Sequence, residues 1–303
     1  MGRRSSGESG ELSASEALKG EADVASMAEK RDRFLGAIGS GSLIMGIVNA
    51  TPDSFSDGGR FQTSAAAVAQ ARRLAAEGAD IIDVGAESTR PGHQPVPADV
   101  EQARLAPLLA DVVESVAQPV SIDTSKASVA RFAAAQGVAF INDVWGLQRD
   151  PAMADVVAET KTGVVIMHNR EAADPACDII SDMRRFFDHS LKLAQAAGIP
   201  AGRIILDPGI GFAKSARQNL QALNGLGAFK DYGLPILVGL SRKSLLGAVV
   251  GDEPIGAMKI EPRLVATLAA NLVAAANGAS IFRVHDAAEH LAAFKVFDAI
   301  RRA

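Results

Sequence analysis

Arg283 and His285 stand two residues apart at the end of a short apolar run near the C-terminus. If that run is a β-strand, both side chains point to the same face. A guanidinium and an imidazole that converge in this way form a site for a phosphate-like anion. The residues alone also allow a structural arrangement, in which Arg283 pairs with a neighbouring carboxylate and His285 caps a helix.

Three further polar residues, Asp123, Asn142 and Asp207, also end short apolar runs. Carboxylates accept pairs of N–H donors, and an amide both donates and accepts, so this trio could read the edge of a nitrogen heterocycle. The same acids beside the cationic Lys243 could instead form a structural ion-pair network. Residue types do not decide between these two interpretations.

Two loops carry more chemistry than a simple connection needs. The segment 49–59, "NATPDSFSDGG", is longer than the usual connection of about two to six residues between a strand and a helix. The segment 207–215, "DPGIGFAKS", contains glycines that indicate positive φ angles or a close backbone approach. It is not a nucleotide-binding P-loop, because Pro208 and Ala213 stand where that motif requires glycine.

The metal-binding residue types predict only a hard cation. The chain has 5 histidines and 1 cysteine, and it lacks the H-E-x-x-H and clustered Cys/His patterns of zinc sites. Any metal is therefore expected to be bound by oxygen. The expected ion is Mg²⁺, shared between a phosphate and Asn49.

Short runs rich in β-branched residues alternate with longer Ala- and Leu-rich stretches of helical period. The predicted strands are 43–49, 79–85, 119–124, 138–144, 162–168, 203–208, 235–240 and 279–285. The predicted helices include 64–77, 98–116, 176–197 and 262–276. The strands recur after about 34 residues, the size of one βα unit. This pattern predicts an α/β fold with a single (β/α)8 TIM barrel over residues 34–303, in preference to a doubly wound open sheet.

A barrel of this kind builds its active site at the carboxyl ends of its strands. Polar residues stand at these ends, whereas the bodies of the strands are apolar. The expected rim residues are Asn49, Glu87, Thr89, Arg90, Asp123, Asn142, Asp143, His168, Asp207, Ser241, Lys243, Arg283 and His285. A purely structural protein would have little use for such a rim.

The composition excludes several classes of protein. The 303 residues are 48% hydrophobic and carry a net charge of -4, with scattered basic residues, which argues against a nucleic-acid surface. No apolar run approaches the roughly 20 residues of a membrane span, and the single Cys177 fits a reducing cytoplasm. Residues 1–33, rich in Ser, Gly, Glu and Lys, are expected to form a flexible tail.

Seven motifs occur in order between residues 42 and 301: "GIVNATPDSFSDGG", "ESTRPG", "SIDTSK", "IND", "LDPGIGF", "GLSRKS" and "FRVHD". Together they resemble the motifs of bacterial dihydropteroate synthases. The resemblance implies a (β/α)8 barrel that joins 6-hydroxymethyl-7,8-dihydropterin pyrophosphate to p-aminobenzoate and releases pyrophosphate, an alkyl transfer in folate biosynthesis. Members of that family are commonly homodimers.

The resemblance also implies roles for residues at matching positions. The pterin slot would be lined by Asp123, Asn142, Met167, Asp207, Lys243 and Arg283. The pyrophosphate would be held by Asn49, Thr89, Arg90, Arg283 and His285, with Asn49 acting through Mg²⁺. The p-aminobenzoate pocket would consist of Phe55, Pro91, Phe212 and Ser244, completed when the 49–59 and "ESTRPG" loops close.

The catalytic residues implied by the resemblance are Asp57, Lys243, Arg283 and His285. Pyrophosphate leaves a carbon that the electron-rich pterin can support as a cation, so the enzyme must stabilise charge separation rather than deprotonate a nucleophile. Arg283 and His285 would act on the leaving group. We hypothesise that Asp57 on the lid steadies the cation, and an unchanged kcat in Asp57→Asn would exclude that role.

The chain departs from the family pattern at three places. Ala86 precedes "ESTRPG" and Ala213 stands in "GFAK", both where glycine is usual. If either site requires a positive φ, alanine costs about 1 kcal/mol or more. After the fifth predicted strand, "MHNREAAD" replaces a Met-rich stretch, so the family role of that loop does not transfer.

Two other functions are open as alternatives. A methyltetrahydrofolate-dependent corrinoid methyltransferase of the same superfamily would share the pterin-reading residues, but it would not need the Arg283 and His285 pair or "SRKS". A pterin-binding paralogue without synthase activity would be supported by Ala213 and by the altered fifth loop. Pterin binding without turnover would distinguish the paralogue.

Overall fold

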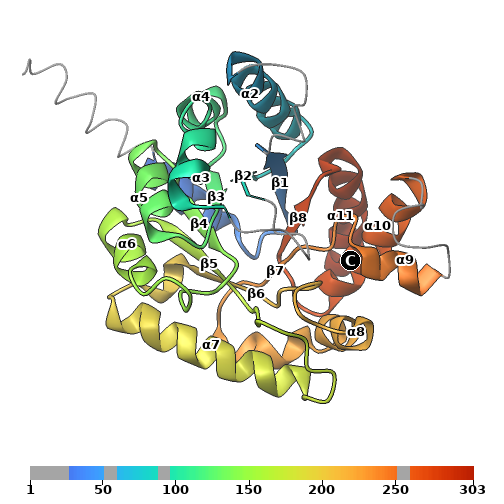
Figure 1. Cartoon of the computed structure of the whole chain (residues 1–303). Coiled ribbons are helices and arrows are strands. Elements are labelled where there is room, and N and C mark those ends of the chain that lie inside the picture. The colour runs from blue at the N-terminus through green and yellow to red at the C-terminus, as the bar shows by residue number, and fades with distance from the viewer. Residues whose placement is uncertain (1–26, 51–59, 88–95, 251–259) are drawn as a thin grey trace, which may run out of the picture.

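The computed structural model describes residues 27–50, 60–87, 96–250 and 260–303 (Figure 1). Within these residues, eight parallel strands form one sheet in the order β6-β5-β4-β3-β2-β1-β8-β7. The strands are β1 (Leu43–Asn49), β2 (Ile81–Gly85), β3 (Val120–Asp123), β4 (Phe140–Asp143), β5 (Gly163–Met167), β6 (Ile204–Asp207), β7 (Leu237–Val238) and β8 (Ile281–Val284). A parallel bridge between Leu206 and Ile236 closes the sheet. The predicted (β/α)8 TIM barrel is therefore confirmed, and the open sheet is excluded.

Helices follow the strands and surround the barrel (Figure 1). They are α2 (Arg60–Ala76), α3 (Ala98–Leu105), α4 (Leu109–Ser115), α5 (Ala127–Ala135), α6 (Met153–Thr160), α7 (Ile179–Ala196), α8 (Ala216–Asn224), α9 (Ser244–Val250), α10 (Ile260–Ala276) and α11 (Ala287–Arg302). The helix expected over 98–116 is divided into α3 and α4. The reason is Pro107 between them, which has no N–H to continue the helical hydrogen bonds.

Side chains alternate along each strand, which sorts the apolar residues into two cores. On β1, Ile44 packs between the barrel and the helices, whereas Leu43 and Met45 belong to an interior cluster. The interior cluster continues with Ile81, Phe140, Val165, Ile205, Leu237 and Ile281. Asp83, Asn142, Asp207 and Arg283 each follow one of these residues by two positions. They therefore point into the same interior, one layer closer to the carboxyl ends.

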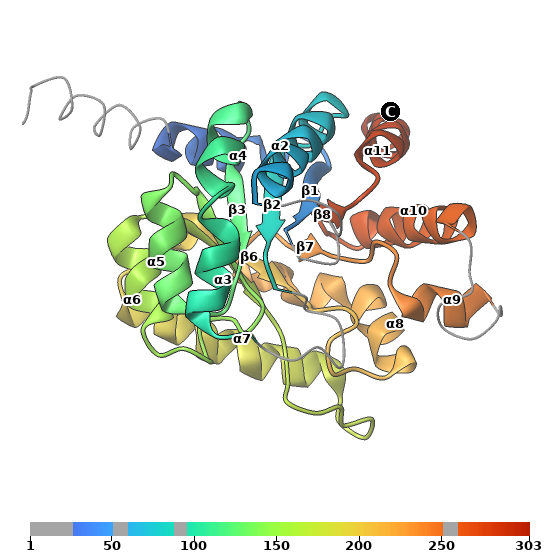
Figure 2. The same ribbon diagram turned by 45° about the horizontal axis from the view of Figure 1, so that its top comes forward.

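A helix at residues 27–37 covers the amino end of the barrel (Figure 2). Met27 and Phe34 from this helix belong to the interior cluster. The rings of Phe34 and Phe140 meet edge to face, with their centroids 5.4 Å apart. The boundary between tail and barrel is expected at residue 33, which lies inside this helix. The helix packs on the interior cluster and is therefore part of the barrel domain from residue 27.

The remaining residues of the expected tail, 1–26, lie outside the described residues. Among the helices that the structure does describe, none is both long enough and apolar enough to cross a membrane.

Candidate active site

Arg283 on β8 is held by carboxylates from β2 and β3. Its Nε donates to Asp83 Oδ2 at 2.6 Å, and its Nη2 donates to Asp123 Oδ2 at 2.9 Å. Burial disfavours the charge of Arg283, but the charges of Asp83 and Asp123 outweigh burial and raise its pKa. The guanidinium therefore stays charged and has a fixed position in the barrel mouth.

Asp83 is not among the expected rim residues. It is fully buried, and its Oδ2 also accepts from Asn142 Nδ2 at 3.3 Å. Its signal in the sequence is a carboxylate inside the apolar run "IIDVG", since an acid in such a run must find a partner when it is buried. The pairing of Arg283 with a carboxylate was the structural alternative for this residue, and it is present.

Asp123 and Asn142 keep buried acceptor atoms that the described chain does not satisfy. The two residues are register partners on β3 and β4, so they lie side by side. Asp123 Oδ1 and Asn142 Oδ1 are both buried and have no hydrogen-bond partner within the described residues. Buried acceptors cost free energy unless a donor reaches them. Neighbouring acceptors of this kind match the N–H edge of a nitrogen heterocycle.

The carboxylates of this site are shifted towards neutrality by burial. Burial raises the pKa of Asp123 to about 7; Arg283 opposes this shift and Asp83 adds to it. Burial also raises the pKa of Asp207, against the backbone N–H of Gly209, which donates to Asp207 Oδ1 at 2.7 Å. A site with perturbed acids in close contact with a guanidinium is typical of a functional centre.

Lys243 connects the loop after β7 with the loop after β6. Its Nζ donates to the carbonyl oxygen of Ile210 and lies 4.6 Å from the centre of the Phe212 ring. Burial lowers the pKa of Lys243 to about 8, while the nearby Asp207 opposes this shift. Lys243 thus carries a charge at neutral pH in a site that disfavours charge.

His285 is oriented by Ser241 from the neighbouring loop. Ser241 Oγ accepts the backbone N–H of His285 at 3.3 Å and lies 2.9 Å from His285 Nδ1. A hydroxyl that accepts from an N–H can donate its own proton to Nδ1, which places the ring proton on Nε2. In that tautomer, Nε2 is the donor that an anion would require.

The 207–215 loop has the strained backbone that its glycines indicate. Gly209 has φ +63, Gly211 has φ +86 and Ala213 has φ +41. A Cβ on Gly209 would lie 1.9 Å from the carbonyl oxygen of His168, so only glycine fits there. Ala213 therefore stands at a positive-φ site, as considered from the sequence, whereas Ala86 does not.

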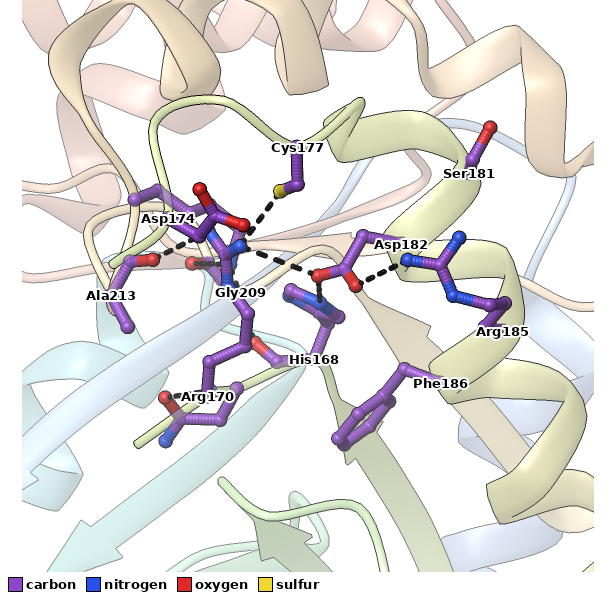
Figure 3. A network of polar contacts seen from close by, with 12 residues as sticks. His168, Arg170, Asp174, Cys177, Ser181, Asp182, Arg185, Phe186, Gly209 and Ala213 are labelled. Carbon is purple, nitrogen blue, oxygen red and sulfur yellow. Dashed lines mark hydrogen bonds and ion pairs between the residues drawn. The ribbon is translucent and has the colours of Figure 1, made fainter. Parts of the chain in front are cut away.

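The loop after β5 forms a separate polar network (Figure 3). His168 Nε2 lies 3.2 Å from Asp182 Oδ2 in the first turn of α7. Burial lowers the pKa of His168 to about 3; the charge of Lys214 adds to this shift and Asp182 opposes it. His168 is therefore neutral near pH 7 and donates to Asp182. This bond joins the loop after β5 to α7.

The other expected site residues divide into described and undescribed ones. Met167 ends β5, is buried and lies level with Asp207. Asn49 ends β1 in an exposed position. Phe55, Asp57, Thr89, Arg90 and Pro91, and the side chain of Ser244, lie outside the described residues.

The fold and the site together define the class of the protein: a (β/α)8 barrel with a charged ligand site at the carboxyl ends of its strands. A family model described as pterin binding enzyme matches residues 45–285, more than half of the chain. The chain therefore belongs to the pterin binding enzyme family.

Known proteins support this assignment. The chain is 42% identical to the dihydropteroate synthase of Clostridium beijerinckii over 266 residues, 88% of this chain and 96% of that one. A crystal structure of Clostridium difficile dihydropteroate synthase in the presence of pteroic acid has a TM-score of 0.83 and 42% identity, over 88% of this chain and 99% of that one. The structure of Xanthomonas albilineans dihydropteroate synthase with 4-aminobenzoic acid has a TM-score of 0.81 and 43% identity, over 86% of this chain and 94% of that one.

Proposed function

We propose that the protein catalyses the dihydropteroate synthase reaction. The C–O bond between the pterin methylene and pyrophosphate breaks, the amine of p-aminobenzoate forms a C–N bond to that carbon, and the amine loses a proton. The products are 7,8-dihydropteroate and pyrophosphate. The observation that carries the proposal is the pair of unsatisfied acceptors on Asp123 and Asn142 beside the charged Arg283, in a chain 42% identical to a dihydropteroate synthase.

In this proposal, the pterin binds with its N–H edge against Asp123 and Asn142. Asp207 and Lys243 complete the polar edge, and Met167 and Arg283 lie on the two ring faces. Because Asp83 holds Arg283 independently of Asp123, the guanidinium keeps its position when Asp123 accepts from a ligand instead. The site is then preorganised for the charge that develops as pyrophosphate leaves.

Arg283 and His285 bind the leaving pyrophosphate, together with Asn49, Thr89 and Arg90. Among the described residues, no group of three or more His, Cys, Asp or Glu could hold a metal ion. Asn49 is exposed, and its amide oxygen is a hard donor that would suit Mg²⁺ if phosphate oxygens and water supplied the other ligands. Such an ion would neutralise charge on the leaving group.

The second substrate, p-aminobenzoate, is assigned to the outer pocket. Phe212 lies beneath the Lys243 ammonium at one wall of this proposed pocket, and Phe55, Pro91 and Ser244 would form the rest. Asp57 is proposed to steady the cation. Sulfonamides, which mimic p-aminobenzoate, are expected to compete for this pocket.

We extend the proposal to a homodimer in the cytoplasm. Val249 on α9 and Val265 and Val273 on α10 are large apolar side chains with 58%, 66% and 54% exposure, as at a subunit contact. The single cysteine of the chain fits a reducing compartment. Sedimentation of the purified protein tests the dimer.

The deciding experiment is pyrophosphate release by the purified protein with the pterin pyrophosphate, p-aminobenzoate and Mg²⁺. We expect turnover that requires p-aminobenzoate and that is lost in Lys243→Ala and Arg283→Ala. Arg242→Gln is a matched control, because Arg242 adjoins Lys243 but pairs with Asp286 at 2.5 Å and is 37% exposed. Tight pterin binding without turnover would instead support the non-catalytic paralogue.

A further inference from the structure

Arg170, in the loop after β5, joins three parts of the chain (Figure 3). Its Nη2 donates to the carbonyl oxygen of Ala213 at 2.6 Å. Its Nη1 donates to Cys177 Sγ at 2.9 Å and lies 3.5 Å from Asp182 Oδ2. The side chain is only 15% exposed. One guanidinium therefore links the β5–α7 loop and the first turn of α7 to the β6–α8 loop.

The β6–α8 loop depends on side chains for its shape, because its backbone lies outside helix and strand. Lys214 Nζ donates to the carbonyl oxygens of Gly209 at 2.7 Å and Phe212 at 3.2 Å. Asn219 Oδ1 accepts the backbone N–H of Gly211 at 2.6 Å. Arg170 donates the hydrogen bond to the carbonyl oxygen of Ala213. Ala213 has a positive φ, which is unfavourable for a residue with a Cβ.

This contact joins two loops at the carboxyl end of the barrel. The loop after β5 supplies Arg170, and the loop after β6 supplies the backbone carbonyl oxygen of Ala213 that Arg170 binds. Phe212 precedes Ala213, and its ring lies beneath the Lys243 ammonium. A shift of Ala213 would therefore move Phe212, the described wall of the outer pocket.

We propose that Arg170 is a positioning residue for the second substrate: it fixes Ala213 and thereby holds Phe212 in place against p-aminobenzoate. This inference rests on the proposed function, which assigns that pocket to p-aminobenzoate. On the pterin side, Arg283 and Asn142 are held by Asp83, which lies in a network apart from Arg170. Lys243 is the pterin-side residue that contacts the same loop, through Ile210 and Phe212. Loss of Arg170 should therefore affect p-aminobenzoate much more than the pterin pyrophosphate.

The first test is steady-state kinetics of Arg170→Ala and Arg170→Lys, with Arg185→Ala as the control. Arg185 binds the same Asp182 at 2.8 Å, but it is 68% exposed. We expect Arg170→Ala to raise the KM for p-aminobenzoate about 10-fold, since small displacements of a positioning group are costly. The KM for the pterin pyrophosphate should stay within about twofold. Arg170→Lys should be intermediate, and Arg185→Ala should match the wild type.

The second test needs no substrate. The chain has 1 cysteine, and Cys177 Sγ accepts from Arg170, so the rate of thiol modification by Ellman's reagent reports on this loop. The reaction is run at a pH where the thiol is fully ionised, so that loss of the neighbouring guanidinium does not change the thiolate fraction. Under that condition Arg170→Ala should react faster than the wild type, whereas Arg185→Ala should not.

An unchanged KM for p-aminobenzoate in Arg170→Ala, or an equal rise in both KM values, would overturn the inference. If Arg170→Ala does not fold, Arg170→Lys carries the kinetic test with the same criteria. A wild-type protein without turnover would refute the proposed function instead. The thiol reaction would then still decide whether Arg170 orders the loop.

Discussion

The two ends of the barrel are filled in opposite ways, although the same strands build both. At the amino end, Phe34 and Phe140 pack in an apolar cluster that a helix covers. At the carboxyl end, Asp83, Asn142 and Arg283 form a charged network on the same inner face. The two layers are two residues apart along each strand, about 7 Å.

The difference shows that the amino end is complete in itself, whereas the carboxyl end is not. The apolar cluster gains its free energy from burial alone. The carboxyl end retains buried acceptors on Asp123 and Asn142 without a partner among the described residues. Lys243 lies at the same end, in a site that disfavours its charge. Stability and activity should therefore separate along the axis of the barrel.

The largest expected effect tests the amino end. Phe140→Ala should lower the free energy of unfolding by about 3–5 kcal/mol, because it empties the space beside Phe34. Urea denaturation measures this loss. Below the unfolding transition, the KM values for both substrates should equal those of the wild type. A rise in these KM values would contradict the separation of stability from activity. Val296→Ala, on the exposed face of α11, is the control and should change stability by less than about 0.5 kcal/mol.

Lys243→Met tests the carboxyl end. Unlike Phe140→Ala, it should raise the free energy of unfolding. The folded pKa of about 8 lies below the ordinary 10.5, so the unfolded chain binds more protons between these values. The wild type should therefore gain stability as the pH rises from 8 to 10.5, and the full cost is present below pH 8. The variant should be more stable by on the order of 3 kcal/mol at pH 7, yet inactive.

The pH dependence provides the check on that prediction. The stability difference between Lys243→Met and the wild type should shrink above pH 8 and vanish near pH 10.5. Lys192→Met removes an exposed lysine and should change neither stability nor turnover. A constant difference across this pH range would show that the amine is not disfavoured by burial.

Asp83→Asn and Asp80→Asn compare an acid within β2 with the acid that directly precedes this strand. Asp83 holds Arg283 at 2.6 Å, so its loss should lower the free energy of unfolding by about 1.5–3 kcal/mol and raise the KM for the pterin pyrophosphate. Asp80, at the amino end, accepts the backbone N–H of Ile44 at 2.7 Å. Asp80→Asn should therefore lower stability and leave both KM values unchanged.

The smallest expected effect concerns Ala213 and Ala86, the two alanines that stand where the resemblance leads one to expect glycine. Ala213→Gly should raise the free energy of unfolding by about 1 kcal/mol, because Ala213 has φ +41. Ala86→Gly should lower it by a similar amount, because Ala86 is fully buried and does not have a positive φ. Thermal unfolding of both variants gives the signs, and equal signs would contradict the backbone argument.

The sequence by itself determined the periodic parts of the fold. The eight expected strands agree with the observed ones to within two residues at each end, because strand periodicity and βα spacing are local properties. It also determined that Asp123, Asn142 and Arg283 stand at the carboxyl ends of strands, since parallel strands of a barrel end on one rim.

Only the tertiary structure decided which of these groups meet. Asp83 and Arg283 are 200 residues apart in the chain, and Arg170 and Ala213 are 43 apart. The helix at residues 27–37 likewise has its partner Phe140 far along the chain. Each of these contacts depends on the closure of the barrel and on loop conformation. Local patterns of hydrophobicity and residue type carry no information about which distant side chain will satisfy a buried charge.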